Sequence, residues 1–352
     1  MQDLSHCSEM TKKQSLCMRL TAGRNQHHSL ILRTVGMSGE SYIPQCSKST
    51  SVQRAYAKIN LSLDVTGKRA DGYHLVDMIM QTVGIYDTLT VAESDDETDD
   101  SGAVSLSIEM ENGGTLSAGE DNLICRAVRS MQKEFGIRKE FDIHLIKRIP
   151  IAAGMAGGST DAAAAFRAVR DLAAPGVTDE KLAELAAGLG ADIPYCIYGG
   201  TKRCRGIGEV LTEMPDAPNC SLVIVKPPVG VSTPWCYKTL DQTEITGRPD
   251  TEAMIRALDA HDLRAVMGSA GNVLEPVTAA AHSEIGEIEE YLRRFKPVRA
   301  MMTGSGPTVF AVFDDAEAAK KAYAAVESDP KFSGYEHFLT GFVKNPYGCR
   351  KA

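Results

Sequence analysis

Alternation of apolar and polar residues predicts that the first ordered part of the chain is a β-strand. The run 55–65 reads Ala-Tyr-Ala-Lys-Ile-Asn-Leu-Ser-Leu-Asp-Val, which is the pattern of a strand with one buried face. A loop is expected over 67–72, and a second strand over 79–91. Shorter apolar runs predict further strands at 141–146, 221–225, 299–302, 308–313 and 336–343.

Apolar residues at helical spacing predict helices between these strands. Four of them recur on one face of a helix expected over 122–135. Thr178, followed by two acids, is a typical helix start, and that helix would end near Gly188 or Gly190. Helices are also expected at 161–172 and 316–326, and the stretch 251–295 is predicted to be mostly helical.

The mixed order of strands and helices predicts an α+β fold with two domains, 54–212 and 213–352. Residues 1–53 are expected to be an N-terminal extension, because they are rich in Ser and basic residues and show no sustained periodicity. Disorder, a targeting peptide and an upstream start codon all fit that composition. The acidic segment 93–100 fails the spacing of a calcium loop, so a solvated connection between strands is expected there.

Composition narrows the class of protein. The 352 residues are 43% hydrophobic and 24% charged, as in a soluble globular protein with a sizeable core. No apolar stretch approaches the roughly 20 residues that span a bilayer, and the net charge of −8 disfavours binding to nucleic acid. With a membrane span and nucleic-acid binding disfavoured, the expected partner is a small molecule. The nine cysteines include no Cys-x-x-Cys pair, so we expect reduced thiols and a cytoplasmic location.

The strongest chemical motif is a loop of small residues, Pro150–Thr160, between a predicted strand and a predicted helix. Small residues let backbone N–H groups approach an anion, and the helix start adds free donors and a favourable dipole. Ser159 and Thr160 could bond phosphate oxygens or a Mg²⁺ ion. A tight packing turn is the alternative interpretation, and the loop matches neither a Walker A sequence nor a dinucleotide fingerprint.

Three other features are weaker when taken alone. Thr303–Gly306 is a glycine turn between two predicted strands, which a plain hairpin would also require. Asp192, in Gly190–Pro194, follows a predicted helix, where a capping or turn residue is the simpler interpretation. Lys58 lies in a strand suited to burial, where lysine is rare without a partner.

Four motifs, Ala57–Leu61, Pro150–Ala162, Gly190–Pro194 and Thr303–Gly306, resemble the successive motifs of the GHMP small-molecule kinases, in the same order. The resemblance covers residues from about 54 to 345. It implies an N-terminal ATP-binding α+β domain and a C-terminal ferredoxin-like α+β domain, with the active site between them. It also implies ATP and Mg²⁺, without assigned metal ligands, and a monomer or a homodimer.

Gly67–His74, Gly206–Glu209 and Ser232–Pro234 are similar to one branch of this family. That branch phosphorylates the 2-hydroxyl of a cytidine-diphosphate-linked methylerythritol in the non-mevalonate isoprenoid pathway. The alternatives are a homoserine or mevalonate type of kinase and a non-catalytic nucleotide-binding relative. The segment 72–74 disfavours the first, because those acceptors carry no base, and the presence of Lys58 and Asp192 disfavours the second.

The resemblance also implies roles for single residues. Asp192 would be the general base and Lys58 its charged neighbour. Because the transition state of phosphoryl transfer is loose, Asp192 would chiefly position the hydroxyl and accept a late proton. The ATP phosphates would be wrapped by Pro150, Ile151, Ala152, Ala153, Gly154, Met155, Ala156, Gly157, Gly158, Ser159 and Thr160, with Asn122 and Lys147 near the adenosine.

On the acceptor side, the resemblance implies that Tyr73 and Tyr237 stack on the cytosine while His74 reads its edge. Asn60 would bond the erythritol hydroxyls, and Thr233 would also contact the acceptor. In the loop, Ala152, Ala153 and Ala156 stand where many relatives carry glycine. Negative φ angles are therefore expected at these three positions, because alanine tolerates left-handed backbone poorly.

Overall fold

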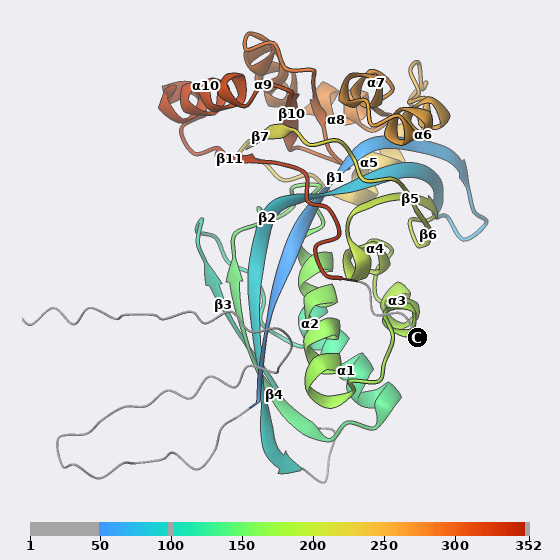
Figure 1. Cartoon of the computed structure of the whole chain (residues 1–352), viewed down its shortest axis with the longest axis vertical. Coiled ribbons are helices and arrows are strands. Elements are labelled where there is room, and N and C mark those ends of the chain that lie inside the picture. Colours follow the sequence, from blue (N-terminus) through green and yellow to red (C-terminus); the bar gives the residue numbers. More distant parts are fainter. Residues whose placement is uncertain (1–48, 98–101, 349–352) are drawn as a thin grey trace, which may run out of the picture. The chain divides into compact units, whose positions relative to one another are not determined.

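The computed structural model describes residues 49–97 and 102–348 (Figure 1). Two long antiparallel strands, β1 (Thr50–Lys68) and β2 (His74–Glu97), form its first hairpin. β1 begins four residues before Arg54, because Thr50 to Gln53 pair with Ala92 to Leu89. Most of the expected N-terminal extension, and the end of the acidic segment 93–100, lie outside the described residues.

β1 and β2 are central to a mixed sheet with the order β3-β4-β2-β1-β8. Outside this row, β5 pairs with another part of β2, and β6 pairs with β5. The last strand of the row, β8, comes from far along the sequence and pairs in parallel with Ser62 and Leu63 of β1. The bounds of these strands are β3 Val104–Met110, β4 Lys139–Lys147, β5 Thr201–Gly206, β6 Val210–Glu213 and β8 Gly271–Asn272.

Helices α1 (Leu123–Phe135) and α2 (Gly157–Ala173) lie side by side, and α2 packs against β1 (Figure 1). α1 confirms the predicted helix, whereas α2 begins four residues earlier than expected, inside the small-residue loop. Helix α3 (Asp179–Ala187) starts as predicted, since the hydroxyl of Thr178 accepts a hydrogen bond from the amide of Lys181. The short helix α4 (Ile193–Tyr198) follows it and was not expected.

The second sheet is antiparallel throughout and has the order β11-β7-β10-β9. This is the strand order of a β-α-β-β-α-β ferredoxin-like arrangement, so the α+β fold class expected from the sequence is confirmed. Its strands are β7 (Ser221–Lys226), β9 (Arg299–Met302), β10 (Val309–Phe313) and β11 (Glu336–Thr340). The associated helices are α5 (Thr233–Leu240), α6 (Thr251–Asp259), α7 (Leu263–Gly268), α8 (Glu275–Ala281), α9 (Glu284–Arg293) and α10 (Ala316–Ser328).

The cores explain why these elements hold together. Phe166 of α2, Met131 of α1 and Leu145 of β4 are fully buried in one apolar cluster, and Phe310 of β10 is buried in a second.

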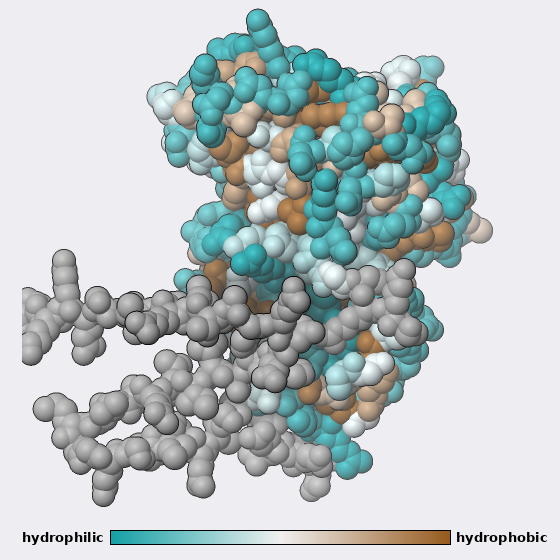
Figure 2. Space-filling view, viewed as in Figure 1, coloured by the Kyte–Doolittle hydropathy of each residue, from teal (hydrophilic) through white to brown (hydrophobic). Residues whose placement is uncertain are grey.

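The boundary at 212 stays a prediction, and β8 shows that the later part of the chain contributes a strand to the first sheet. On the face shown in Figure 2, hydrophilic residues cover much of the visible surface of the described residues, with smaller hydrophobic patches among them. Among the helices of the described ranges, none has both the length and the apolarity to cross a bilayer.

Candidate active site

A cavity of about 810 Å³ lies where the predicted motifs meet. Its walls come from β1, the β1–β2 turn, the small-residue loop, the start of α4, helix α5 and the second glycine turn. Most of the predicted site residues line it. These are Lys58, Asn60, Tyr73, His74, Lys147, Pro150, Ile151, Ala152, Ala153, Gly154, Ala156, Gly157, Gly158, Ser159, Asp192, Thr233 and Tyr237.

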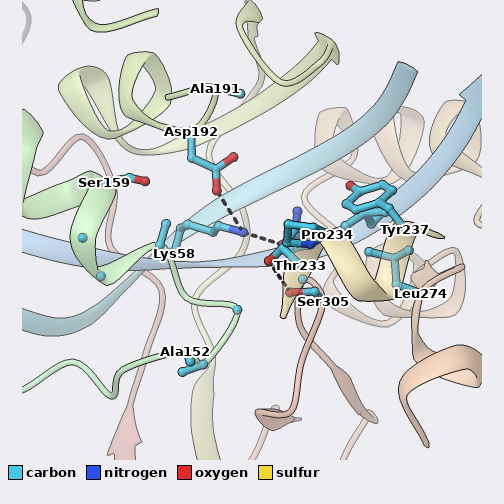
Figure 3. Close-up of a pocket in the computed structure, with 18 of the residues that line it drawn as sticks. Lys58, Ala152, Ser159, Ala191, Asp192, Thr233, Pro234, Tyr237, Leu274 and Ser305 are labelled. Atoms are coloured by element: carbon cyan, nitrogen blue, oxygen red, sulfur yellow. Dashed lines mark hydrogen bonds and ion pairs between the residues drawn. The ribbon is translucent and has the colours of Figure 1, made fainter. Parts of the chain in front are cut away.

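Lys58 and Asp192 point toward one another across the cavity (Figure 3). The Nζ atom of Lys58 lies 3.8 Å from Oδ2 of Asp192 and donates a hydrogen bond of 2.7 Å to Oδ1 of Asn60. Lys58 is only 5% exposed, so its charge is held by these partners rather than by water. Asp192 is the first residue before α4, but its side chain makes no capping bond there. The Asp192 carboxylate therefore lines the cavity with Lys58 as its ion-pair partner.

The small-residue loop does not have the backbone that was expected. Ala152 has φ of 52° and Ala156 has φ of 58°, so the expectation of negative φ is wrong at two of its three positions. Left-handed backbone costs an L-residue roughly 1–2 kcal/mol. Alanine bears this cost, although its side chain is the smallest that has a Cβ atom. At Ala156 this conformation turns the chain directly into α2. The loop thus has left-handed backbone at two alanines as well as at Gly154.

The two glycine turns touch each other. A Cβ atom on Gly154 would lie 2.4 Å from the carbonyl oxygen of Thr303, and one on Gly304 would lie 2.7 Å from the carbonyl oxygen of Gly154. Only glycine permits this approach of backbone to backbone. Asn272 fixes the second turn, since its side-chain amide donates to the carbonyl oxygens of Met302 and Gly304. Motifs about 150 residues apart in sequence therefore form one surface of the cavity.

The N-terminus of α2 opens onto this surface. Ser159 lines the cavity, and the first amides of a helix have no acceptor within the helix. Three residues expected to bind ATP lie elsewhere. Met155 and Thr160 are buried and do not line the cavity, and Asn122 caps α1, accepting from the amide of Ile124. Their contribution to ATP binding stays a prediction.

Beneath the loop, Lys147 is buried between two carboxylates. Its Nζ atom donates to Asp87 at 2.5 Å and to Asp161 at 2.7 Å. Burial lowers the pKa of Lys147, but the charges of Asp161 and Asp87 outweigh burial and hold it above its usual value. Burial raises the pKa of Asp161 well above its usual range, and the charge of Lys147 opposes that shift. Lys147 supports the loop from below as well as lining the cavity.

Three rings, those of Tyr73, His74 and Tyr237, line one part of the cavity, which we call its ring end. The His74 ring lies 4.9 Å from that of Tyr237, tilted by 31°, while Tyr73 is 61% exposed at the rim. Burial raises the pKa of Tyr237. The hydroxyls of Thr233 and Ser305 are 2.9 Å apart.

The sequence did not single out several residues that line the cavity. Ser305 lies within a motif that was recognised only for its glycines. Lys68 and Asp241 also line it; Lys68 lies within Gly67–His74 but was given no role, and Asp241 lies in none of the motifs. Within residues 49–97 and 102–348, no group of three or more His, Cys, Asp or Glu side chains could hold a metal ion.

Comparison with known proteins agrees with this arrangement. Residues 122–200 match the GHMP kinases N terminal domain, and residues 254–331 match the GHMP kinases C terminal domain. The chain is 43% identical over 292 residues to a 4-diphosphocytidyl-2-C-methyl-D-erythritol kinase of Lachnoclostridium phytofermentans, covering 83% of this chain and 97% of that protein.

Two solved structures share the fold. A 4-(cytidine 5'-diphospho)-2C-methyl-D-erythritol kinase superposes with a TM-score of 0.66 at 26% identity, over 83% of this chain and 99% of its own. A homoserine kinase from Cytophaga hutchinsonii superposes with a TM-score of 0.69 at 18% identity, over 88% of this chain and 99% of its own. At that lower identity the likeness concerns the fold alone.

Proposed function

The chain belongs to the 4-diphosphocytidyl-2-C-methyl-D-erythritol kinases of the GHMP kinase family, and on that premise we propose how its own residues carry out the reaction. It is an ATP-dependent small-molecule kinase that phosphorylates the 2-hydroxyl of 4-diphosphocytidyl-2-C-methyl-D-erythritol, in the non-mevalonate route to isoprenoid precursors. The observation that carries the proposed mechanism is the Lys58–Asp192 pair, which shares one cavity with the start of α2 and with the rings of His74 and Tyr237.

The donor end is the surface formed by the small-residue loop and the N-terminus of α2. The phosphates of ATP bind there, where free backbone amides and the helix dipole favour negative charge. Ser159 adds a hydroxyl, and Lys58 adds a positive charge beside the transferring group. ATP binds with Mg²⁺, which stabilises charge on the phosphates. Ser159 and Asp192 are the cavity residues that would hold the ion, together with phosphate oxygens and water.

The acceptor hydroxyl lies beside Asp192. The carboxylate orients the hydroxyl toward the phosphorus and accepts its proton late, since little charge develops on the nucleophile in a loose transition state. Lys58 fixes the position of Asp192 and stabilises charge that builds up during transfer. Positioning and electrostatics thus supply most of the rate.

The acceptor's cytosine lies at the ring end of the cavity. Tyr73 and Tyr237 stack on the base, His74 reads its edge, and Asn60 and Thr233 bond the remainder of the molecule. Stacking holds any base, so the edge contact supplies the preference for cytosine. A cytoplasmic location and a monomeric or homodimeric state complete the proposal.

The test is release of ADP from Mg·ATP with four acceptors offered separately: the cytidylated methylerythritol, methylerythritol phosphate, homoserine and mevalonate. Turnover with the cytidylated acceptor alone is expected. Turnover with homoserine or mevalonate instead would keep the fold family and remove the cytosine site. Binding of ATP without turnover on any acceptor would favour a non-catalytic nucleotide-binding protein.

A further inference from the structure

A carboxylate outside the proposed catalytic pair joins three elements at the ring end of the cavity. Asp241, the residue that ends α5, accepts a hydrogen bond of 2.6 Å from Nζ of Lys68 through Oδ2. Its Oδ1 atom lies 2.7 Å from Nε2 of His74. Lys68 is the last residue of β1 and His74 the first of β2. Asp241 therefore ties both ends of the β1–β2 turn to α5.

We infer that Asp241 is a positioning residue that fixes the tautomer of His74 and thereby makes the kinase select a cytosine over a uracil acceptor. The inference rests on the proposed function, in which His74 reads the edge of the base. It assigns the selection to a residue that need not touch the base.

The first step concerns the proton on His74. An ionised carboxylate only accepts hydrogen bonds, so Nε2 of His74 must carry the proton in the bond to Asp241. The hydrogen bond from Lys68, followed by that from His74, lowers the pKa of Asp241, which keeps the carboxylate ionised. Lys68 also balances its charge, so the group of three is neutral overall when His74 carries one proton.

The second step concerns the other ring nitrogen. In a neutral imidazole with its proton on Nε2, Nδ1 is a hydrogen-bond acceptor. Within the part of the chain that the structure describes, Nδ1 of His74 has no hydrogen-bond partner. The ring lines the cavity and is held against Tyr237, so the acceptor is available where the proposed function places the base.

The third step is the chemistry of the base. Cytosine presents an exocyclic amino group at C4, which donates, whereas uracil presents a carbonyl oxygen there, which accepts. An acceptor at Nδ1 bonds the amino group and faces the uracil oxygen lone pair to lone pair. The opposite tautomer would reverse this preference, so the site is selective only while His74 is held in one tautomer.

Asp241→Asn tests the inference, because asparagine keeps the size of the side chain but can accept from Nε2 or donate to it. The measurement is kcat/KM for the cytidine-diphosphate acceptor and for its uridine-diphosphate analogue. We expect the ratio of the two to fall at least about tenfold, with the KM for ATP unchanged. Asp314→Asn is the matched control, because Asp314 pairs with Arg264 at an exposed position and does not line the cavity.

The outcomes separate the inference from the function on which it rests. Wild-type protein that turns over neither nucleotide-linked acceptor would overturn the proposed function. An unchanged cytosine-to-uracil ratio in Asp241→Asn, or an equal loss with both acceptors, would overturn the role of Asp241 alone.

A second measurement does not depend on activity. Nitrogen NMR of the resting wild-type protein, with the His74 signal assigned through His74→Gln, is expected to show the proton on Nε2. A proton on Nδ1 would contradict the inference even if Asp241→Asn failed to fold.

Discussion

The ammonium group of Lys147 lies 2.7 Å from the carboxylate of Asp161, and both side chains are buried beneath the small-residue loop. Asp161 belongs to the first turns of α2, and Lys147 ends β4. The second partner, Asp87, also accepts from the backbone amides of the two residues after Lys147. One buried charge thus ties β2, β4 and α2 together. A Cβ atom on Gly157 would lie 2.9 Å from this ammonium group, so the loop rests directly on it.

Replacing Lys147 by Met should strongly destabilise the protein. The change leaves Asp87 and Asp161 buried side by side without their cation, and breaking such a group costs roughly 3–5 kcal/mol. Urea unfolding measures the loss. Lys181→Met is the control, because that lysine pairs with Glu134 and Glu184 at the surface and its loss should leave the midpoint unchanged. Equal midpoints for both variants would contradict the structural role of Lys147.

Asp192→Asn should lower kcat by at least about 100-fold while leaving ATP affinity nearly intact. The amide keeps the size of the side chain but cannot accept the proton of the acceptor hydroxyl. Steady-state kinetics and calorimetric ATP binding measure the two effects. Asp216→Asn, a change at an exposed position that does not line the cavity, is the control. Near-normal turnover in Asp192→Asn would remove Asp192 from the mechanism.

Tyr73→Ala should raise the KM for the cytidylated acceptor and leave that for ATP unchanged. The ring is mostly exposed in the structure, so its removal creates no cavity, and stacking on a base is worth roughly 1–3 kcal/mol. That range corresponds to an increase of about 5- to 150-fold. Tyr73→Phe keeps the ring and should behave like the wild type. An effect on ATP rather than on the acceptor would mean that the two ends of the cavity had been assigned in reverse.

Ala152 and Gly154 both have left-handed backbone in the loop, but exchanging alanine and glycine should have opposite effects at the two positions. Ala152→Gly should stabilise the protein by roughly 0.5–1 kcal/mol, because it relieves a left-handed alanine at an exposed position. Gly154→Ala should destabilise it by more than that, because the new Cβ would meet the carbonyl oxygen of Thr303. Thermal unfolding of both variants measures the signs. A stable Gly154→Ala variant would show that the two turns need not touch.

The acids of α8 and α9 should make stability depend on pH. Burial, and then the charge of Glu275, raise the pKa of Glu289 to about 7. A carboxyl whose pKa is raised on folding contributes stability that is complete below about pH 4.5 and is lost as pH rises through about 7. Glu289→Gln removes this loss, so the stability of the variant relative to wild type should increase by up to about 3 kcal/mol between pH 4.5 and 8.

Urea unfolding at several pH values measures this difference. Glu290→Gln, on the exposed side of the same helix, is the control. The loss of the 2.6 Å pair between Glu289 and Arg293 acts against the gain, but Arg293 is largely exposed and the pair is correspondingly weak. A difference that does not vary with pH would contradict the raised pKa.

Periodicity predicted the longer elements because their burial repeats along the chain. It located α1 and the start of α3, and the strand at 221–225 is extended by one residue. It missed α5 and the two-residue strand β8, which are too short for a repeat and depend on distant partners.

The motifs identified the cavity because each one encodes its local geometry. The contacts between them could not be predicted from local sequence. The residue type of Ala152 does not indicate its positive φ, and the bond between Asp241 and His74 joins residues 167 positions apart.

The parallel pairing of β1 with β8 has a consequence for synthesis on the ribosome. Leu63 emerges early, but Asn272, its neighbour in the sheet, follows about 200 residues later. At roughly 5–20 residues per second, the edge of β1 at Ser62 and Leu63 therefore stays without its β8 partner for about 10–40 seconds. During that interval the edge is a site for pairing with other chains. Ribosomes that stall between the two strands should release a product prone to aggregation, however well its first helices have formed.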